Sequence, residues 1–191
     1  MAVHLSRIYT RTGDAGTTRL ADFSETRKTD PRLAAYADVD EANAAIGVAV
    51  TCGELTDELV ELLHDVQNDL FDVGADLATP VIADPEVAPL RITQDAVDAL
   101  EQACDTWNAD LPALDSFVLP GGTAGSAYLH VARTVTRRAE RTAWAAVDAH
   151  GGSVSTLPAI YLNRLSDLLF ILGRVANAAV GDVLWVPGRR Q

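Results

Sequence analysis

Apolar residues recur at helical spacing over most of the chain, and prolines and glycines separate the helical segments. A first helix is predicted from Asp30-Pro31 to about Thr51, because an acidic N-cap precedes proline at the first helical position and Gly53 follows the end. Its apolar and small positions are Leu33, Ala34, Tyr36, Ala37, Val39, Ala44, Ala45 and Ile46. A second helix is predicted from about Thr56 to Ala78. Its helically spaced apolar residues are Leu59, Leu62, Leu63, Val66, Leu70, Val73 and Leu77.

Three more helices are predicted downstream, after a proline-rich crossover loop at residues 79–92. They cover about Thr93 to Asn108, near Thr123 to about Ala149, and about Thr156 to Ala179, with a break at Gly151-Gly152. The last helix has an apolar stripe that predicts a core face: Leu162, Leu165, Leu169 and Leu172. A second, mostly polar row predicts contact with a ligand, a partner subunit or water: Asn163, Asp167, Phe170, Arg174 and Asn177.

This pattern predicts an all-α protein, an antiparallel helical bundle of five helices with a four-helix core and one crossover loop. The 191 residues are expected to form one domain. Within it we expect an ordered amino-terminal loop segment at 1–29, the bundle at 30–180 and a short extended tail at 181–191 that contains Trp185.

Composition narrows the possible functions. The formal net charge of -12 argues against general nucleic-acid binding, which needs a dominant basic field. No segment has the length and apolar character of a membrane span or a signal peptide, so we expect a cytoplasmic protein. Cys52 and Cys104 match no metal-binding spacing and are expected to be buried or partly buried free thiols. His64 lies in the single Glu-x-x-His motif and is expected to be structural or on the surface.

Four arginines lie close together in the fourth predicted helix: Arg133, Arg137, Arg138 and Arg141. Like charges one helical turn apart repel, so an opposing anion would stabilise this face. The anion could be a carboxylate from another helix or subunit, or a bound polyphosphate, and a solvated basic face is the simpler alternative. Asp40 is the carboxylate we expect to pair with the arginines, whereas Asp38 and Glu41 could equally be surface acids.

The amino-terminal segment contains a loop rich in glycine and threonine, from Thr10 to Thr18. Two glycines allow tight turns whose N–H groups, with the threonine hydroxyls, could bind a phosphate. The loop lacks the Gly-Lys-Ser/Thr of a Walker motif, and an ordinary turn remains an alternative. Together with the arginines and with Asn163 and Asp167, which could bind a sugar, this loop predicts a polyphosphate-binding bundle.

Five ordered motifs resemble those of the PduO-type ATP:cob(I)alamin adenosyltransferases. They are Tyr9 to Thr17, Tyr36 to Asn43, Phe117 to Gly122, Arg133 to Arg141, and Tyr161 to Phe170, and the similarity extends over roughly residues 8 to 186. Arg11 and Ala15 stand where many members have lysine, Ala37 replaces a frequent glycine, and Ala42 replaces a frequent leucine.

The resemblance implies a homotrimer with active sites between subunits. It implies catalytic roles for Arg133, Asp40 and Phe117, with Asp40 pairing across the interface with an arginine, most simply Arg133. Phe117 would face the corrin ring and exclude the lower axial ligand of cobalt. The implied ATP-binding residues are Thr10, Arg11, Thr12, Gly13, Asp14, Gly16, Thr17, Thr18, Lys28, Arg133, Arg137, Arg138, Glu140 and Asn163.

The implied reaction transfers the 5'-deoxyadenosyl group of ATP to Co(I) of cob(I)alamin, giving adenosylcobalamin and triphosphate. ATP and cobalamin are then substrates, and Mg2+ is held mainly by the phosphates. Possible partners are a reductase of Co(II) and an enzyme that uses adenosylcobalamin. The alternative function is a non-catalytic corrinoid carrier that delivers adenosylcobalamin to such an enzyme, although a pure carrier has no use for a triphosphate site.

Overall fold

The structure is a computed structural model that describes residue 9 and residues 11–189. The described residues form five α-helices and one short 3-10 helix, so the predicted all-α class is confirmed. The helices are α1 (Pro31–Cys52), α2 (Asp57–Ala78), α3 (Gln94–Asn108), α4 (Ala124–His150), η1 (Gly151–Ser153) and α5 (Leu157–Ala176).

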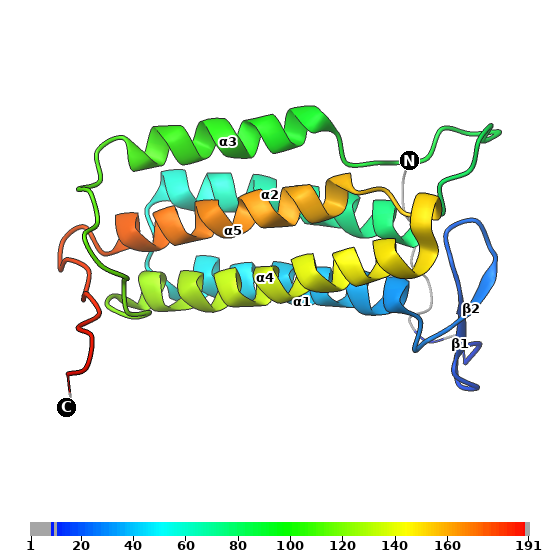
Figure 1. Cartoon of the computed structure of the whole chain (residues 1–191), viewed down its shortest axis with the longest axis horizontal. Helices are drawn as coiled ribbons and strands as arrows, with labels where there is room; N and C mark the ends of the chain where they lie inside the picture. Colours follow the sequence, from blue (N-terminus) through cyan, green and yellow to red (C-terminus); the bar gives the residue numbers. More distant parts are fainter. Residues whose placement is uncertain (1–8, 10, 190–191) are drawn as a thin grey trace.

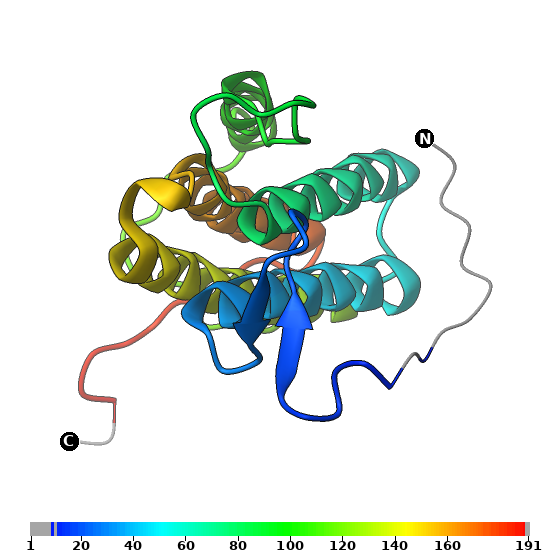
Figure 2. The same ribbon diagram turned by 90° about the vertical axis from the view of Figure 1, so that its right-hand side faces the viewer.

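Helices α1, α2, α5 and α4 surround one hydrophobic core, and each packs against the next in that order. Neighbouring helices in this group run in opposite directions (Figure 1). Helix α3 lies outside the group and packs against α5, as the end-on view shows (Figure 2). The predicted four-helix core is therefore confirmed, with α3 as the outer helix.

The expected N-cap of α1, Asp30, caps that helix, and the side chain of Thr123 caps α4. Asp30 accepts a hydrogen bond from the N–H of Arg32 at 2.8 Å, and Thr123 accepts one from the N–H of Ser126 at 3.1 Å. Helix α5 ends at Ala176, three residues earlier than predicted, because Asn177 caps it. The amide group of Asn177 bonds to the loop before α4: its oxygen accepts from the N–H of Thr123 and its nitrogen donates to the carbonyl of Gly121.

Small residues form the seam between α1 and α4. The alanines at this seam are fully buried: Ala35, Ala42 and Ala49 on α1, and Ala132, Ala139, Ala143 and Ala146 on α4. Alanines let two helix axes approach closely, because the separation depends on side-chain size at the contact. Not all of the apolar and small positions of α1 belong to the core, since Ala34, Ala37 and Ala44 are exposed.

The amino-terminal segment contains a hairpin that the sequence did not predict. Strand β1 (Thr17–Arg19) pairs antiparallel with β2 (Glu25–Arg27), and Arg19 lies opposite Glu25. The hairpin lies beside one end of the bundle (Figure 2). The N–H of Ala21 in its turn donates a hydrogen bond to the carbonyl of Ala78 at the end of α2. Both strands are short and mostly polar, so they lack the alternation that marks a strand.

The hairpin is joined to the bundle by a polar cluster around Asp30. The Asp30 carboxylate lies 2.8 Å from His150 Nε2 and accepts a bond from the hydroxyl of Thr26 at 3.1 Å. Burial alone would raise the pKa of Asp30, but the hydrogen bonds from Arg32, His150 and Thr26 outweigh it and the pKa is lowered. The start of α1 and the end of α4 are thereby held together.

Two residues of the polar row on α5, Arg174 and Asn177, form hydrogen bonds with other parts of the same chain. Arg174 is buried, donates to Asp182 at 2.9 Å and donates to the carbonyl of Pro112 at 2.7 Å. Asn177 also donates to Asp182. The expected contact with a ligand, a partner subunit or water was therefore wrong for these two residues, because they bond to the loop before α4 and to the tail of their own chain.

The two cysteines differ in their exposure. Cys52 is exposed, contrary to the prediction, whereas Cys104 is partly buried. Burial raises the pKa of Cys104 to about 11, so its thiol stays protonated at neutral pH. His64 is exposed, as expected for a surface histidine. In the described part of the chain, no helix is long and apolar enough to cross a membrane.

Candidate functional site

A polar cavity of about 480 Å3 lies along the hairpin. Its lining comes from the predicted loop and from the two strands: Thr12, Gly13, Thr17, Thr18, Arg19 and Glu25. Four of these six residues were predicted from the sequence as phosphate-binding positions. The turn from Gly13 to Gly16 is closed by a hydrogen bond from the N–H of Gly16 to the carbonyl of Gly13. Gly16 has a positive φ of 83°. Glycine adopts this backbone conformation without strain.

The ammonium group of Lys28 lies beside Gly13, one of the residues that line this cavity. A β-carbon placed on Gly13 would lie 2.8 Å from Lys28 Nζ, so the lysine approaches the loop where the loop has no side chain. The N–H of Lys28 donates to the carbonyl of Gly16 at 2.9 Å, which fixes the backbone at this position. The cavity therefore combines threonine hydroxyls, backbone N–H groups and cations, which is the chemistry that binds phosphate groups.

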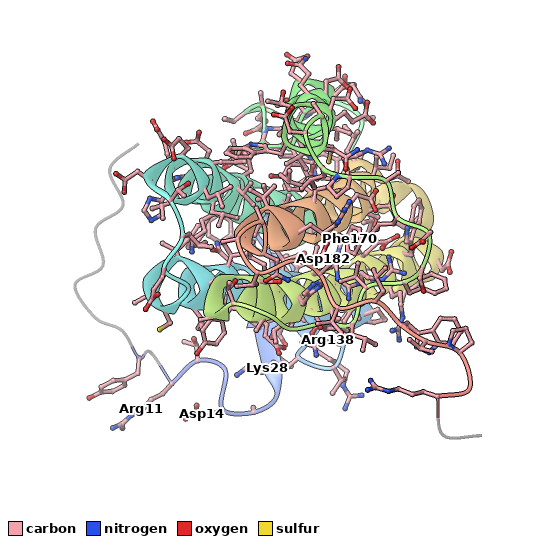
Figure 3. The ribbon with its side chains drawn as sticks, turned by 90° about the vertical axis from the view of Figure 1, so that its left-hand side faces the viewer. Arg11, Asp14, Lys28, Arg138, Phe170 and Asp182 are labelled. Atoms are coloured by element: carbon pink, nitrogen blue, oxygen red, sulfur yellow. The ribbon has the colours of Figure 1, made fainter. Side chains whose placement is uncertain are left out.

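Other residues of the predicted loop lie at its edge. Thr10 is outside the described residues. Arg11 and Asp14 are exposed on the loop (Figure 3), and the Arg11 guanidinium lies 5.6 Å from the ring centre of Tyr9. Cation–π packing holds the Arg11 charge beside the loop and leaves its donors accessible.

Among the described residues, no carboxylate pairs with Arg133 in the arginine row on α4. Arg133 is partly buried, and its Nε atom is buried with no hydrogen-bond partner in the described structure. Burial lowers the pKa of Arg133, and the neighbouring charge of Arg137 lowers it further. A partly desolvated guanidinium without an anion is unfavourable, so an anion placed beside Arg133 would stabilise this part of α4.

Arg138 differs from Arg133 because its charge is balanced within the chain. Its guanidinium pairs with Glu41 and lies 3.5 Å from an oxygen of Asp38 on α1. The hydrogen bond with Glu41 raises the pKa of Arg138. The carboxylates of α1 that face the arginine helix in one chain are thus Asp38 and Glu41. The predicted contact of Arg138 with ATP stays a prediction.

Two other predicted site residues meet on α4 and α5. The side-chain amide of Asn163 donates to the carboxylate of Glu140 at 3.1 Å, and both side chains remain accessible. Asp167, in contrast, accepts a bond from Arg164, whose guanidinium also donates to Glu101 on α3. Asn163 and Glu140 therefore extend the arginine row as a polar pair, whereas Asp167 belongs to the contact with α3.

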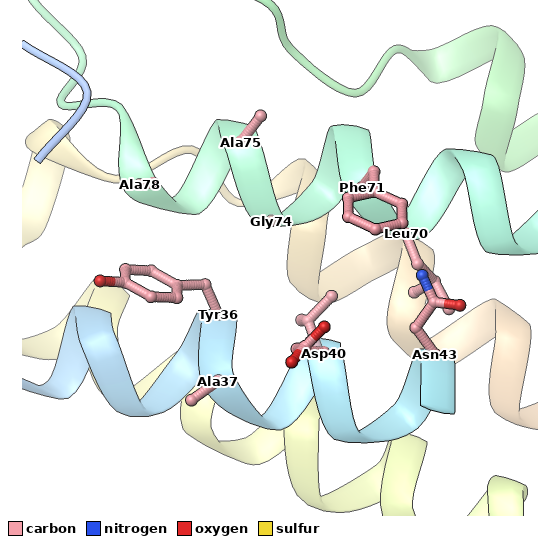
Figure 4. A pocket seen from close by; sticks show the side chains of 10 residues that line it. Tyr36, Ala37, Asp40, Asn43, Leu70, Phe71, Gly74, Ala75 and Ala78 are labelled. Carbon is pink, nitrogen blue, oxygen red and sulfur yellow. The ribbon is translucent and has the colours of Figure 1, made fainter. Parts of the chain in front are cut away.

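Asp40 faces a different direction from its neighbours Asp38 and Glu41. It is exposed and lines a groove of about 520 Å3 between α1 and α2, together with Tyr36 and Phe71 (Figure 4). Phe71 is 71% exposed, so the groove has an uncovered aromatic wall. Asp40 consequently pairs with none of the arginines of α4 in its own chain, and its predicted pairing across a subunit interface stays a prediction.

An aromatic groove lies at the end of the molecule opposite the hairpin, where the loop before α4 meets the tail. Phe117 is 77% exposed and its ring centre is 5.9 Å from that of Trp185 in the tail. The N–H of Trp185 donates to the carbonyl of Phe117 at 2.7 Å, and an antiparallel bridge joins Val118 to Leu184. The groove, of about 830 Å3, is lined by Leu114, Asp115, Ser116, Phe117, Leu184, Trp185, Val186 and Pro187. Phe117 is a surface residue and not part of the core.

The parts of the predicted site are spread over the chain. The hairpin, whose residues line the polar cavity, lies at the end of the bundle where α4 finishes (Figure 1). Arg133 lies about 25 Å from that end along the helix axis, at the usual rise of 1.5 Å per residue. The sequence did not predict that Arg19, Glu25 and Trp185 line these cavities. Arg19 directly follows the Thr10–Thr18 loop and could have been indicated by that position, whereas Glu25 and Trp185 stand beside no motif.

The fold and these surfaces define a helical-bundle protein with three features. They are a polar cavity whose groups suit a phosphate, a partly buried arginine on α4 without a hydrogen-bond partner at Nε in the described structure, and a separate aromatic groove. A family model for cobalamin adenosyltransferases matches residues 8–176. The chain therefore belongs to the cobalamin adenosyltransferase family, and the resemblance seen in the sequence motifs is confirmed.

Individual relatives agree with this family. The chain is 66% identical over 188 residues to a corrinoid adenosyltransferase of Mycobacterium tuberculosis, covering 98% of this chain and 97% of the relative. It is 64% identical over 191 residues to that of Mycobacterium leprae, covering 98% of this chain and all of the relative.

A solved structure from Lactobacillus reuteri has the same fold. It is a variant PduO-type ATP:corrinoid adenosyltransferase complexed with cobalamin and ATP, and it matches with a TM-score of 0.84 at 39% identity, covering 94% of this chain and 99% of that one. A second variant of that enzyme, complexed with ATP, matches with a TM-score of 0.82 at 36% identity and covers 94% of this chain and all of that one.

Proposed function

We propose that this chain transfers the 5'-deoxyadenosyl group of ATP to the cobalt of cob(I)alamin, giving adenosylcobalamin and triphosphate. The observation that carries the proposal combines two features. The hairpin cavity has groups that suit a phosphate, and Arg133 on α4 is partly buried with no hydrogen-bond partner at Nε among the described residues. The relatives named above are corrinoid adenosyltransferases, and the cited complex from Lactobacillus reuteri contains both cobalamin and ATP.

The hairpin cavity is the proposed site of the triphosphate. Thr12, Thr17 and Thr18 offer hydroxyl groups, and Lys28 offers an ammonium beside Gly13. These groups favour an anion, and charge-assisted bonds to phosphate are stronger than neutral ones. Thr10, Arg11, Asp14 and Gly16 remain proposed contacts on the same loop, in agreement with the motif that they form.

The second part of the ATP site is proposed to come from a neighbouring subunit. In one chain the hairpin cavity and Arg133 are separated by much of the length of α4. Arg137, Glu140 and Asn163 lie on the same helix pair as Arg133, so they would approach the hairpin of a second copy together. An active site between subunits follows, with Arg138 as a further proposed contact.

We propose that copies of this chain form a closed ring. Asp40 and Arg133 lie on different faces of the chain, so their pairing joins unlike surfaces of two copies. A contact between unlike surfaces repeats around an axis and closes when the rotation fits a whole number of copies. Two charges that have no ion-pair partner among the described residues of one chain would thereby neutralise each other. The number three is taken from the family resemblance.

The corrinoid is proposed to bind beside Phe117. The side chain projects from the loop before α4 into an open, largely apolar groove, so it can contact a flat macrocycle. An apolar wall displaces water and other ligands from the cobalt, because a buried polar ligand would lose its hydrogen bonds there. Arg133 and Asp40 are the other two residues that we propose for catalysis, as the interface pair that orders the site.

The chemistry requires no catalytic base. The lone pair of Co(I) forms the bond to C5' of ATP, the C5'–O bond breaks, and triphosphate leaves with that electron pair. The protein must align the two reactants and stabilise the charge of the leaving group. A divalent cation, which we propose to be Mg2+, would be held mainly by the phosphates. Among the described residues no three His, Cys, Asp or Glu side chains form a metal cluster.

The direct test is an anaerobic assay of the purified chain with ATP, Mg2+ and chemically reduced cob(I)alamin. Loss of the Co(I) absorbance with formation of a light-sensitive product and triphosphate would support the transferase. No turnover with tight binding of adenosylcobalamin would support the carrier instead. The reductase, the receiving enzyme and the cytoplasmic location stay predictions.

A further inference from the structure

One carboxylate lies among the cations of the hairpin cavity. Arg19 is opposite Glu25 in the hairpin register, and Thr17 is opposite Arg27. Side chains two apart on a strand and directly opposite across a ladder lie on the same face. One face of the hairpin therefore carries Thr17, Arg19, Glu25 and Arg27. Glu25 is the one acidic residue among the described residues that line the cavity.

The simplest role for Glu25 would be a cross-strand ion pair with Arg19, which would stabilise the hairpin. The structure does not contain that pair: within the described residues, no carboxylate lies within 4.0 Å of the Arg19 guanidinium, although the two residues are directly opposite. Both side chains line the cavity. The Glu25 carboxylate is thus exposed inside a site whose other groups suit an anion.

A carboxylate in a triphosphate site repels the phosphates unless a cation lies between them. Mg2+ reverses the sign of this interaction, because it binds through one or two protein carboxylates together with the phosphates of a nucleotide. The donor set of the cavity fits such an ion, with one carboxylate, threonine hydroxyls and room for the phosphates and water.

We propose that Glu25 binds the divalent cation of the metal–ATP complex, directly or through one water molecule. This inference rests on the proposed function, because the hairpin cavity must be the triphosphate site. Glu25 then has a role apart from catalysis: it makes the site prefer metal-bound ATP over free ATP. Arg19 and Lys28, which carry the opposite charge, bind the phosphates themselves.

The test is the metal dependence of ATP binding, measured by titration calorimetry on the full chain with no corrinoid present. Each protein is titrated with ATP in EDTA and with ATP in excess Mg2+. In Glu25→Gln, metal-free ATP should bind about two- to fivefold more tightly because a repulsion is removed. The Mg2+ complex should bind about three- to tenfold more weakly because a ligand of the cation is lost. These opposite changes are the expected result.

Glu86→Gln is the matched control, since Glu86 is an exposed glutamate in the crossover loop and its substitution makes the same change in net charge. It should leave both affinities unchanged. Asp14→Asn tests the carboxylate of the Thr10–Thr18 loop. The proposal is overturned if the native chain binds Mg2+-ATP and Glu25→Gln changes both affinities in the same direction or neither. It is also overturned if Asp14→Asn, and not Glu25→Gln, gives the opposite changes. Failure of the native chain to bind Mg2+-ATP would reject the triphosphate site itself.

Discussion

The ring of His130 on α4 packs edge-on against the ring of Phe170 on α5, with 6.1 Å between the ring centres. His130 is 2% exposed, and neither ring nitrogen has a partner in the described structure. Burial lowers the pKa of His130 below 6.5, Arg133 lowers it further, and Asp182 acts in the opposite sense. The folded chain therefore favours the neutral imidazole.

This packing predicts an acid dependence of stability. Just below pH 6.5 the unfolded chain binds a proton at His130 that the folded chain does not, so the free energy of unfolding should fall as the pH falls through this range. Urea unfolding at several pH values should show a smaller loss in His130→Asn than in the native chain. Equal slopes in the two proteins would show that His130 does not contribute.

Replacing Arg137 by alanine should weaken ATP binding. Arg137 is exposed beside Arg133, so its fork of donors is available to phosphate. Losing a charge-assisted contact should cost about 1.5 to 3 kcal/mol, or about 10- to 150-fold in Kd. Arg164→Ala is the control, because that guanidinium is paired with Glu101 and Asp167. Unchanged binding in Arg137→Ala would remove this residue from the site.

The proposed subunit contact can be tested by charge reversal. Asp40→Arg and Arg133→Asp should each disrupt the oligomer, because each places like charges opposite one another. The double variant should recover assembly at least in part, which analytical ultracentrifugation would measure. Asp38→Arg is a useful comparison, since Asp38 pairs with Arg138 inside the chain and has no predicted role between subunits. If the single variants assemble normally, Asp40 and Arg133 are not partners.

Replacing Phe117 by alanine should affect the corrinoid and not ATP. Because the side chain is 77% exposed, the variant should fold with a stability change within about 0.5 kcal/mol. ATP affinity should stay within about twofold of the native value, and the reduction of bound Co(II) should become harder because water can reach the cobalt. Electron paramagnetic resonance of bound cob(II)alamin would report the axial ligand. An unchanged spectrum would place the corrinoid elsewhere.

The helices could be predicted well because their ends depend on local chemistry. Asp30, Thr93 and Thr123 cap their helices through their own side chains, which a sequence displays directly. The end of α5 was placed too late because Asn177 is used by a loop far away in sequence. The buried face of α1 could not be predicted from its alanines, because an alanine can lie on either face of a helix and packing within the bundle decides which.

The site was harder to predict than the fold. The cavity positions Thr12, Gly13, Thr17 and Thr18 were found because their motif is contiguous, and the structure brings them together. Arg19 and Glu25 were missed because the hairpin that brings them together has no periodic pattern. The distinct directions of Asp38 and Asp40 depend on the rotation of α1 within the bundle, which sequence spacing alone did not resolve.

The central claim is a single displacement at the C5' carbon of ATP, and isotopic labelling tests it most directly. The protein is incubated anaerobically with Mg2+, cob(I)alamin and ATP that carries 13C at C5', and the products are examined by NMR. We predict one equivalent of adenosylcobalamin with the label on the cobalt-bound carbon, together with one equivalent of intact triphosphate. Formation of ADP or AMP, or recovery of unchanged ATP with no labelled corrinoid, would contradict the account.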